Sequence, residues 1–204
     1  MSFPPKTVLH APDAEAEAIR RAVREADLSG LGPGRAVAEL KHVPGLVALL
    51  ADPAVSDWIY DLPRPITPES VTRWVTENQA RRLAGEALLL VTLDEAGEVS
   101  GYSHIAVWPE RSSAELAGAI RADLQNRGQG GTGMARSFGW IFEHLGVRLM
   151  CLTAALDNIR SQKGIDAAGF RRMGERDVTR PDGTVRRSVY WELTRDEWER
   201  LHRL

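Results

Sequence analysis

The sequence predicts one mixed α/β domain, with a central, largely antiparallel sheet that is flanked by helices. Three strand-like segments follow one another at residues 87–93, 99–108 and 114–120, joined by short turns. Short connections between consecutive strands favour antiparallel hairpins. A helix, a strand and another helix follow, and residues 170–179 and 185–193 then flank the turn at 181–183. A chain of 204 residues suffices for one such domain with its own core.

Composition narrows the class of protein. The 43% hydrophobic and 26% charged residues are typical of a soluble globular protein. A formal net charge of −2 argues against general nucleic-acid binding, which needs a basic excess. The first residues lack the apolar core of a signal peptide, and no apolar run approaches the ~20 residues that span a bilayer. We therefore expect a cytoplasmic protein without nucleic-acid or membrane partners.

Residues 1–34 are interpreted as an N-terminal helical extension, and residues 35–204 as the main domain. The extension contains an alanine-rich, charged helix after Pro12, which the glycines at 30, 32 and 34 bring to an end. Only Ile19, Val23 and Leu28 are large apolar residues in it. Two interpretations remain open: a surface helix docked on the core, or a contact in a homodimer.

The first half of the main domain is expected to hold a short strand and two helices. The strand covers residues 35–40, and a helix begins near Pro44 and stops at Pro53. Thr67 is a cap residue before Pro68, so a second helix begins there. Its expected apolar side consists of Val71, Trp74, Val75 and Leu83. The proline-rich loop between the helices carries Trp58, Ile59 and Tyr60.

The glycine-rich stretch at residues 127–133 indicates a phosphate site. Apolar residues recur at helical spacing from Met134 to Leu145, and Gly146 supplies a stop. Glycine lets a backbone approach a ligand without a Cβ in the way. The start of a helix adds free N–H groups and the positive end of a dipole. An apolar strand, a glycine-rich loop and a helix thus form a cradle for a phosphate.

One interpretation of this stretch is a dinucleotide site. Residues 128–133 satisfy G-x-G-x-x-G, and Asp157 follows the next apolar strand, where a ribose-binding acid belongs. However, seven largely polar residues separate Ile120 from the first glycine, whereas a dinucleotide loop follows its strand directly. The upstream strands also form a meander instead of βα units. A P-loop is excluded because no lysine follows Gly133.

The other interpretation rests on a resemblance. Arg127-x-x-Gly130 resembles the R/Q-x-x-G-x-G/A signature of the GNAT superfamily of acyl-CoA-dependent N-acyltransferases. Asn158-Ile-Arg-Ser161 followed by Gly169-Phe170 is similar to the N-x-x-S…G-F block of its Rim-type branch, which acetylates ribosomal-protein N-termini and other amines. The resemblance covers roughly residues 35 to 195. It implies the GNAT fold, acetyl-CoA as co-substrate and no metal.

The resemblance also implies the residues that bind the cofactor. The backbone of the glycine-rich loop would hold the pyrophosphate of coenzyme A, and Asn158 and Ser161 would contact its pantetheine arm or the acetyl group. The full set of expected cofactor contacts is Ile120, Arg127, Gly128, Gln129, Gly130, Gly131, Thr132, Gly133, Asn158 and Ser161. Thr132 departs from the family, which usually has glycine or alanine there. An alternative role for Asn158 is to cap the following helix.

Candidate catalytic residues are Glu115, His104 and Ser161. A base is useful because an amine with a pKa near 10 is mostly protonated at neutral pH. Glu115 precedes Arg127 by twelve residues, nearly where several family members carry a base, and its alternative role is an outward-facing residue at a strand end. His104, on the preceding strand, is the second candidate or a structural histidine. The tyrosine that commonly protonates the leaving thiolate is replaced by Ile165, so Ser161 becomes the proton donor.

The function predicted from the sequence is therefore transfer of an acetyl group from acetyl-CoA to a primary amine, by direct attack in a ternary complex. The acceptor is a protein N-terminus or a small-molecule amine. Alternatives are a non-catalytic acyl-CoA-binding module and, less favoured, an NAD-binding enzyme. The single cysteine, Cys151, lies in an apolar strand and is expected to be a buried, inert thiol.

Overall fold

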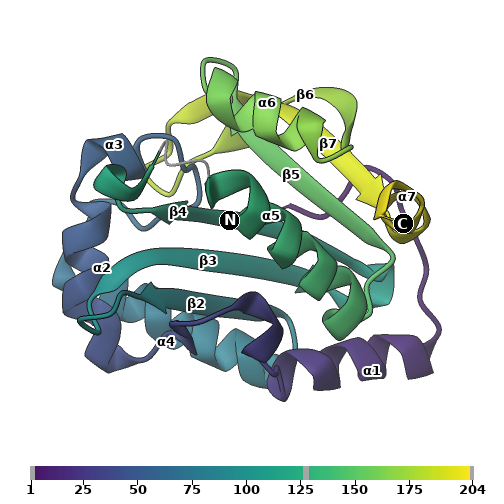
Figure 1. Cartoon of the computed structure of the whole chain (residues 1–204), viewed down its shortest axis with the longest axis horizontal. Coiled ribbons are helices and arrows are strands. Elements are labelled where there is room, and N and C mark those ends of the chain that lie inside the picture. Colours follow the sequence, from purple (N-terminus) through teal and green to yellow (C-terminus); the bar gives the residue numbers. More distant parts are fainter. Residues whose placement is uncertain (1–2, 126–128, 203–204) are drawn as a thin grey trace.

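The computed structural model describes residues 3–125 and 129–202, except for the side chains of 129–132, and it confirms the predicted fold class. A seven-stranded sheet has the order β1-β2-β3-β4-β5-β7-β6 (Figure 1). Within the described residues, β4 and β5 form the one parallel pair, and all other neighbours are antiparallel. The strands are β1 (Arg35–Val37), β2 (Ala87–Leu93), β3 (Val99–Trp108), β4 (Ser113–Ile120), β5 (Leu149–Ala155), β6 (Arg171–Thr179) and β7 (Val185–Thr194).

Helices cover both faces of the sheet. Figure 1 shows α5 crossing in front of the sheet, whereas α4 lies behind β2. The helices are α1 (Asp13–Arg24), α2 (Val43–Leu50), α3 (Pro53–Ser56), α4 (Pro68–Ala84), α5 (Gln129–Trp140), α6 (Ile159–Ala167) and α7 (Arg195–His202). A wider π turn, Ile141–Leu145, continues α5 up to Gly146, whose φ of 77° gives the expected stop.

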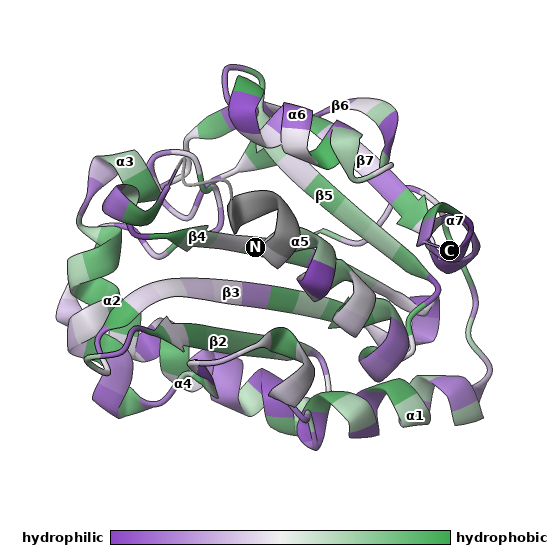
Figure 2. Cartoon of the chain, viewed as in Figure 1, coloured by the Kyte–Doolittle hydropathy of each residue, from purple (hydrophilic) through white to green (hydrophobic). Residues whose placement is uncertain are grey.

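The two faces of the sheet build two separate cores. On the α5 face, Ile19 and Val23 of α1 join Phe138 of α5 and Trp191 of β7. On the other face, α2 and α4 pack against β2 and β3, and the green ribbon of β2 in Figure 2 marks its apolar residues. The helix of the N-terminal extension is therefore docked on the α5-side core. No helix among the described residues is long and apolar enough to cross a membrane.

Capping chemistry explains where α4 begins and ends. The Thr67 hydroxyl accepts from the Ser70 amide at 3.2 Å, and the Ser70 hydroxyl accepts from the Thr67 amide at 3.0 Å. Gly85 closes the helix in the left-handed conformation. The start predicted at Thr67 is therefore confirmed.

One residue of the expected apolar side of α4 was placed wrongly. Leu83 is 75% exposed, and Asn78 is buried instead. An α-helix turns about 100° per residue, so Leu83 lies about 120° around the axis from Val71, whereas Asn78 is close to the same line. The apolar side of α4 therefore ends before its last turn.

The start of α5 also differs from the prediction. The helix begins at Gln129, so glycines that we expected in a loop belong to its first turn. Glycine costs about 1 kcal/mol relative to alanine inside a helix, but the first turn makes few intrahelical bonds and tolerates it. The N-terminal helix α1 likewise ends at Arg24, before the glycines that were expected to stop it.

Candidate active site

The strands β4 and β5 pair only briefly and then diverge. Their register covers Ser113–Glu115 of β4 and Leu149–Cys151 of β5, whereas β4 stays paired with β3 as far as Ile120. Figure 1 shows β5 leaving β4 at an angle, with α5 in front. Residues Leu116–Ile120 are half-buried or exposed, and Ile120 is 39% exposed. On the side of β5, this stretch of β4 is therefore not paired with a strand.

Glu115 is the last residue of β4 in register with β5. Its side chain is 3% exposed, so it is not the outward-facing glutamate of the alternative interpretation. The Tyr60 hydroxyl lies 3.2 and 3.1 Å from the two carboxylate oxygens. The Thr153 hydroxyl of β5 donates to Oε1 at 3.4 Å. A buried carboxylate needs such donors, because an unpaired charge in the interior is costly.

His104 lies on the same face of the sheet as Glu115. In the β3–β4 register Glu115 is opposite Ala106, and His104 is opposite Ala117, so the two polar side chains are diagonal neighbours. Imidazole Nδ1 is 3.2 Å from Oδ2 of Asp61, and both side chains are buried. Nε2 is also buried and has no hydrogen-bond partner in the part of the chain that the structure describes. The histidine thus keeps one ring nitrogen available for proton transfer.

The Asp61 carboxyl has a lowered pKa. Burial acts in the opposite direction and is the largest single influence, but the hydrogen bond and the charge of His104 outweigh it. An ionised Asp61 fixes the imidazole with a proton on Nδ1. In the neutral imidazole, Nε2 then carries the free lone pair that a proton acceptor needs.

The expected cofactor residues Asn158 and Ser161 lie at the start of α6, shortly after the end of β5. Asn158 caps α6, because its Oδ1 accepts from the Ser161 amide at 3.1 Å. The Ser161 side chain is half-buried in the first turn of that helix. Ile165 is 5% exposed and belongs to the apolar core, so this position supplies no proton.

The glycine-rich stretch is only partly described. Arg127 and Gly128 lie outside the described residues, as do the side chains of Gln129 to Thr132. Gly133 is described, and the space where a side chain would begin is open. A Cβ at this residue would meet no atom of another element of the described chain.

Sequence reasoning missed Tyr60, Asp61 and Thr153 as parts of the site. Tyr60 and Asp61 come from the loop between α3 and α4, which folds across the sheet so that adjacent residues meet different strands. Loop aromatic and acidic residues are common, and nothing in their spacing signals this contact. Thr153 was detectable only through the strand register.

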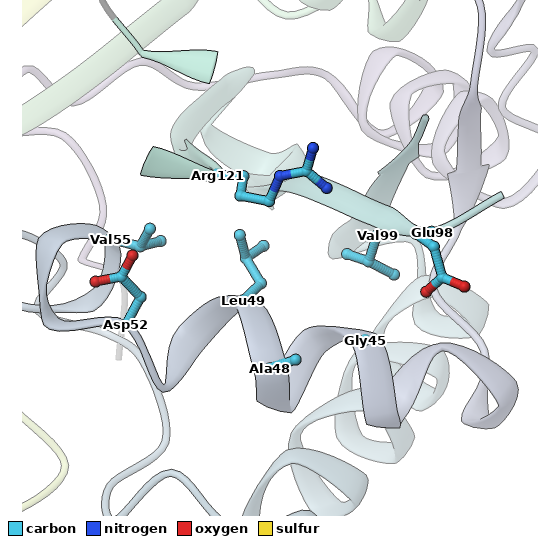
Figure 3. Close-up of a pocket in the computed structure, with 8 residues that line it drawn as sticks. All are labelled: Gly45, Ala48, Leu49, Asp52, Val55, Glu98, Val99 and Arg121. Atoms are coloured by element: carbon cyan, nitrogen blue, oxygen red, sulfur yellow. The ribbon is translucent and has the colours of Figure 1, made fainter. Parts of the chain in front are cut away.

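A surface pocket lies elsewhere (Figure 3). It has a volume of about 300 Å³ and is lined by Gly45, Ala48, Leu49, Asp52, Val55, Glu98, Val99 and Arg121. Arg121 follows the end of β4, so at roughly 3.3 Å per residue its backbone lies about 20 Å along the strand from Glu115. The described residues hold no cluster of metal ligands.

Comparisons with known proteins agree with this geometry. The acetyltransferase (GNAT) domain family matches residues 35–171. None of the curated proteins matches the chain. Among solved structures, RimJ of Mycobacterium smegmatis in complex with CoA-disulfide has a TM-score of 0.68 at 16% identity, covering 80% of this chain and 82% of its own.

Two further solved structures have the same fold. RimL, an alpha-N-protein acetyltransferase of a ribosomal protein solved with coenzyme A, has a TM-score of 0.68 at 17% identity, covering 82% of this chain and 97% of its own. The ribosomal-protein-S5-alanine acetyltransferase from Vibrio fischeri has a TM-score of 0.67 at 13% identity, covering 80% and 93%. These identities are low, so the likeness concerns the fold.

Proposed function

Because the chain belongs to the GNAT acetyltransferase family, we propose that it transfers an acetyl group from acetyl-CoA to a primary amine. The observation that carries this proposal is the position of Glu115, a buried carboxylate at the point where β4 leaves β5. The edge of β4 that β5 leaves unpaired is partly exposed beside it. A thioester held between the two strands would reach a face of the sheet that carries two titratable groups.

Coenzyme A fits this arrangement through main-chain groups. The partly exposed edge of Leu116–Ile120 suits the amides of a pantetheine arm, and Ile120 ends that edge. We propose that the amides of the first turn of α5, from Gln129 to Gly133, hold the pyrophosphate together with Arg127 and Gly128. Asn158 and Ser161, at the start of α6, would contact the pantetheine arm of coenzyme A from the side of β5.

The amine would be bound on the opposite face of the sheet from α5, where Glu115 and His104 lie. In the proposed reaction the neutral amine nitrogen bonds to the carbonyl carbon of the thioester, and the C–S bond breaks. One proton leaves the nitrogen and one proton ends on the sulfur of coenzyme A. Glu115 or His104 would accept the first proton. Ser161 is the proposed donor to the sulfur, since Ile165 has no proton to give.

A thermal-shift assay followed by thiol release tests this function. Acetyl-CoA and coenzyme A should raise the unfolding temperature, because a ligand that binds only the folded state stabilises it. NAD should not. Thiol release with a panel of primary amines should then depend on both substrates. Stabilisation by acetyl-CoA without release from any amine would favour the non-catalytic acyl-CoA-binding alternative, and stabilisation by NAD alone would refute the proposal.

A further inference from the structure

The segment Phe3–Leu9, called the N-terminal arm here, lies on the same face of the sheet as Glu115. In the strand register Glu115 is opposite Cys151, and Cys151 is opposite Glu192 of β7. Thr153, which donates to Glu115, is likewise opposite Tyr190. Residues that are opposite in a sheet share a face, and the arm binds Tyr190 and Glu192.

The arm is held by hydrogen bonds to buried groups. The Lys6 amide donates to the Tyr190 hydroxyl at 2.9 Å, and the Thr7 amide donates to Glu192 Oε1 at 3.0 Å. The Thr7 hydroxyl donates to the other oxygen of Glu192, a carboxylate that is 1% exposed. These contacts use both oxygens of a buried charge, so displacing the arm leaves that charge without most of its donors.

Cation contacts extend the attachment along β6 and β7. The Lys6 ammonium donates to the carbonyl of Met173 at 3.0 Å and lies 5.1 Å from the centre of the Tyr190 ring. The Arg176 guanidinium lies 4.7 Å from the Tyr190 ring and 5.4 Å from the Phe3 ring. Arg176 is opposite Ser188, so the arm follows β7 from Ser188 toward Glu192.

The remaining flank of Glu115 is covered as well. The α3–α4 loop places Tyr60 on the carboxylate and Asp61 on His104, and Trp74 of α4 packs edge-on against the His104 ring at 6.2 Å. The chain itself therefore occupies the sheet on both sides of the site. An extended peptide needs a free strip of about 3.3 Å for each residue, whereas a small amine does not.

From this arrangement we propose that the acceptor is a small-molecule primary amine, and that the arm occupies the strip of β6 and β7 along which a polypeptide acceptor would lie. This inference rests on the proposed acetyl transfer and names its substrate class. The arm belongs to residues 1–34, which precede the region matched by the family. The fold shared with ribosomal-protein acetyltransferases therefore carries a different acceptor preference here.

The experiment compares acetyl transfer to two kinds of acceptor. The full chain is assayed by thiol release with small amines (a polyamine, an aminoglycoside and an amino acid amide) and with peptides that have free amino termini. A second protein lacks residues 1–9, and a third is the double variant Lys6→Ala/Thr7→Val, which keeps the chain length. Val8→Ala is the matched control, because Val8 is the next residue along and is 52% exposed.

Hydrogen exchange at the amides of residues 6 and 7 reports whether the arm has left the sheet. In the full chain both should be protected, and in the double variant both should exchange faster. We expect kcat/KM of the full chain to be higher for at least one small amine than for any peptide. Releasing the arm should raise kcat/KM for peptides by about tenfold or more, a change of about 1.4 kcal/mol, with little effect on small amines.

Two results would overturn the inference. One is a full chain that acetylates peptides more efficiently than every small amine. The other is a variant whose arm has left the sheet, as hydrogen exchange reports, and whose kcat/KM for peptides is unchanged. A different outcome is that no acceptor gives thiol release and that coenzyme A does not raise the unfolding temperature. That outcome refutes the proposed function itself.

Discussion

The hydroxyl of Tyr60 lies within hydrogen-bonding distance of both carboxylate oxygens of Glu115, at 3.2 and 3.1 Å, and both side chains are buried. The contact joins the loop between α3 and α4 to the strand that the cofactor would follow. A loop residue thus holds the charge of the candidate active site. Any movement of that loop would change the environment of the carboxylate.

Tyr60→Phe should destabilise the protein. The substitution removes a donor to a buried charge, which typically costs about 1.5–3 kcal/mol of unfolding free energy. Urea unfolding at neutral pH measures the loss. Tyr102→Phe is the matched control, since the buried Tyr102 hydroxyl has no partner among the described residues and its removal should be neutral or stabilising. Equal destabilisation of both variants would contradict the contact.

Glu115→Gln should separate binding from turnover. Glutamine has nearly the same shape and still accepts a hydrogen bond from Tyr60, so the variant should fold and bind acetyl-CoA as the wild type does. If the carboxylate takes the proton from the amine, kcat falls by about 10²- to 10⁴-fold. Fixed-time assays of thiol release at saturating concentrations of both substrates measure kcat. An unchanged kcat would transfer the role of base to His104.

Asp61→Asn tests the orientation of His104. The asparagine amide can present a donor to Nδ1 and so place the imidazole proton on Nε2. If His104 accepts a proton in the reaction, kcat should fall while the affinity for acetyl-CoA is kept. Nitrogen-15 chemical shifts of the ring report the tautomer directly. His42, which is buried and accepts from the Glu39 amide instead of contacting Asp61, is the control ring and should not change.

Much of the fold was predictable because it depends on sequence patterns over short stretches of the chain. The strand meander follows from short connections, and Thr67 and Gly146 mark helix ends through capping chemistry. Burial of Glu115 was not predictable, because it depends on Tyr60 and Thr153, which are distant in sequence. The same holds for the arm, whose attachment uses Tyr190 and Glu192 near the other end of the chain.

The start of α5 was mispredicted for a related reason. Glycine has a low helix propensity, so a glycine-rich stretch is expected to form a loop. Helix boundaries depend on what packs behind them, and Phe138, Ile141 and Phe142 anchor this helix in the core. The helix then extends back to Gln129 in spite of its composition. Tertiary packing outweighs local propensity at this position.

The pair of Asp61 and His104 should make stability depend on pH. The hydrogen bond and charge of His104 lower the folded-state pKa of Asp61 below its ordinary value of 3.8, against the effect of burial. A lowered pKa contributes stability that is present above the unfolded-state pKa and is lost as pH falls through the folded-state value. The difference in unfolding free energy between wild type and Asp61→Asn should therefore be fully present above about pH 5 and shrink below about pH 4. A difference in unfolding free energy that stays constant down to pH 3 would contradict the lowered pKa of Asp61.

The thiol of Cys151 should be inert in the folded protein. Burial raises its pKa well above the ordinary value, and the nearby Glu115 carboxylate adds to the effect, so the reactive thiolate is scarce. Reaction with a disulfide reagent at pH 8 should follow unfolding of the chain, and urea should accelerate it. The raised folded-state pKa also means that the unfolded chain loses this proton first, so the thiol contributes stability at neutral pH that declines as pH rises above about 9. Rapid labelling of the native protein would show that Cys151 is accessible from the site, and would contradict its burial beside Glu115.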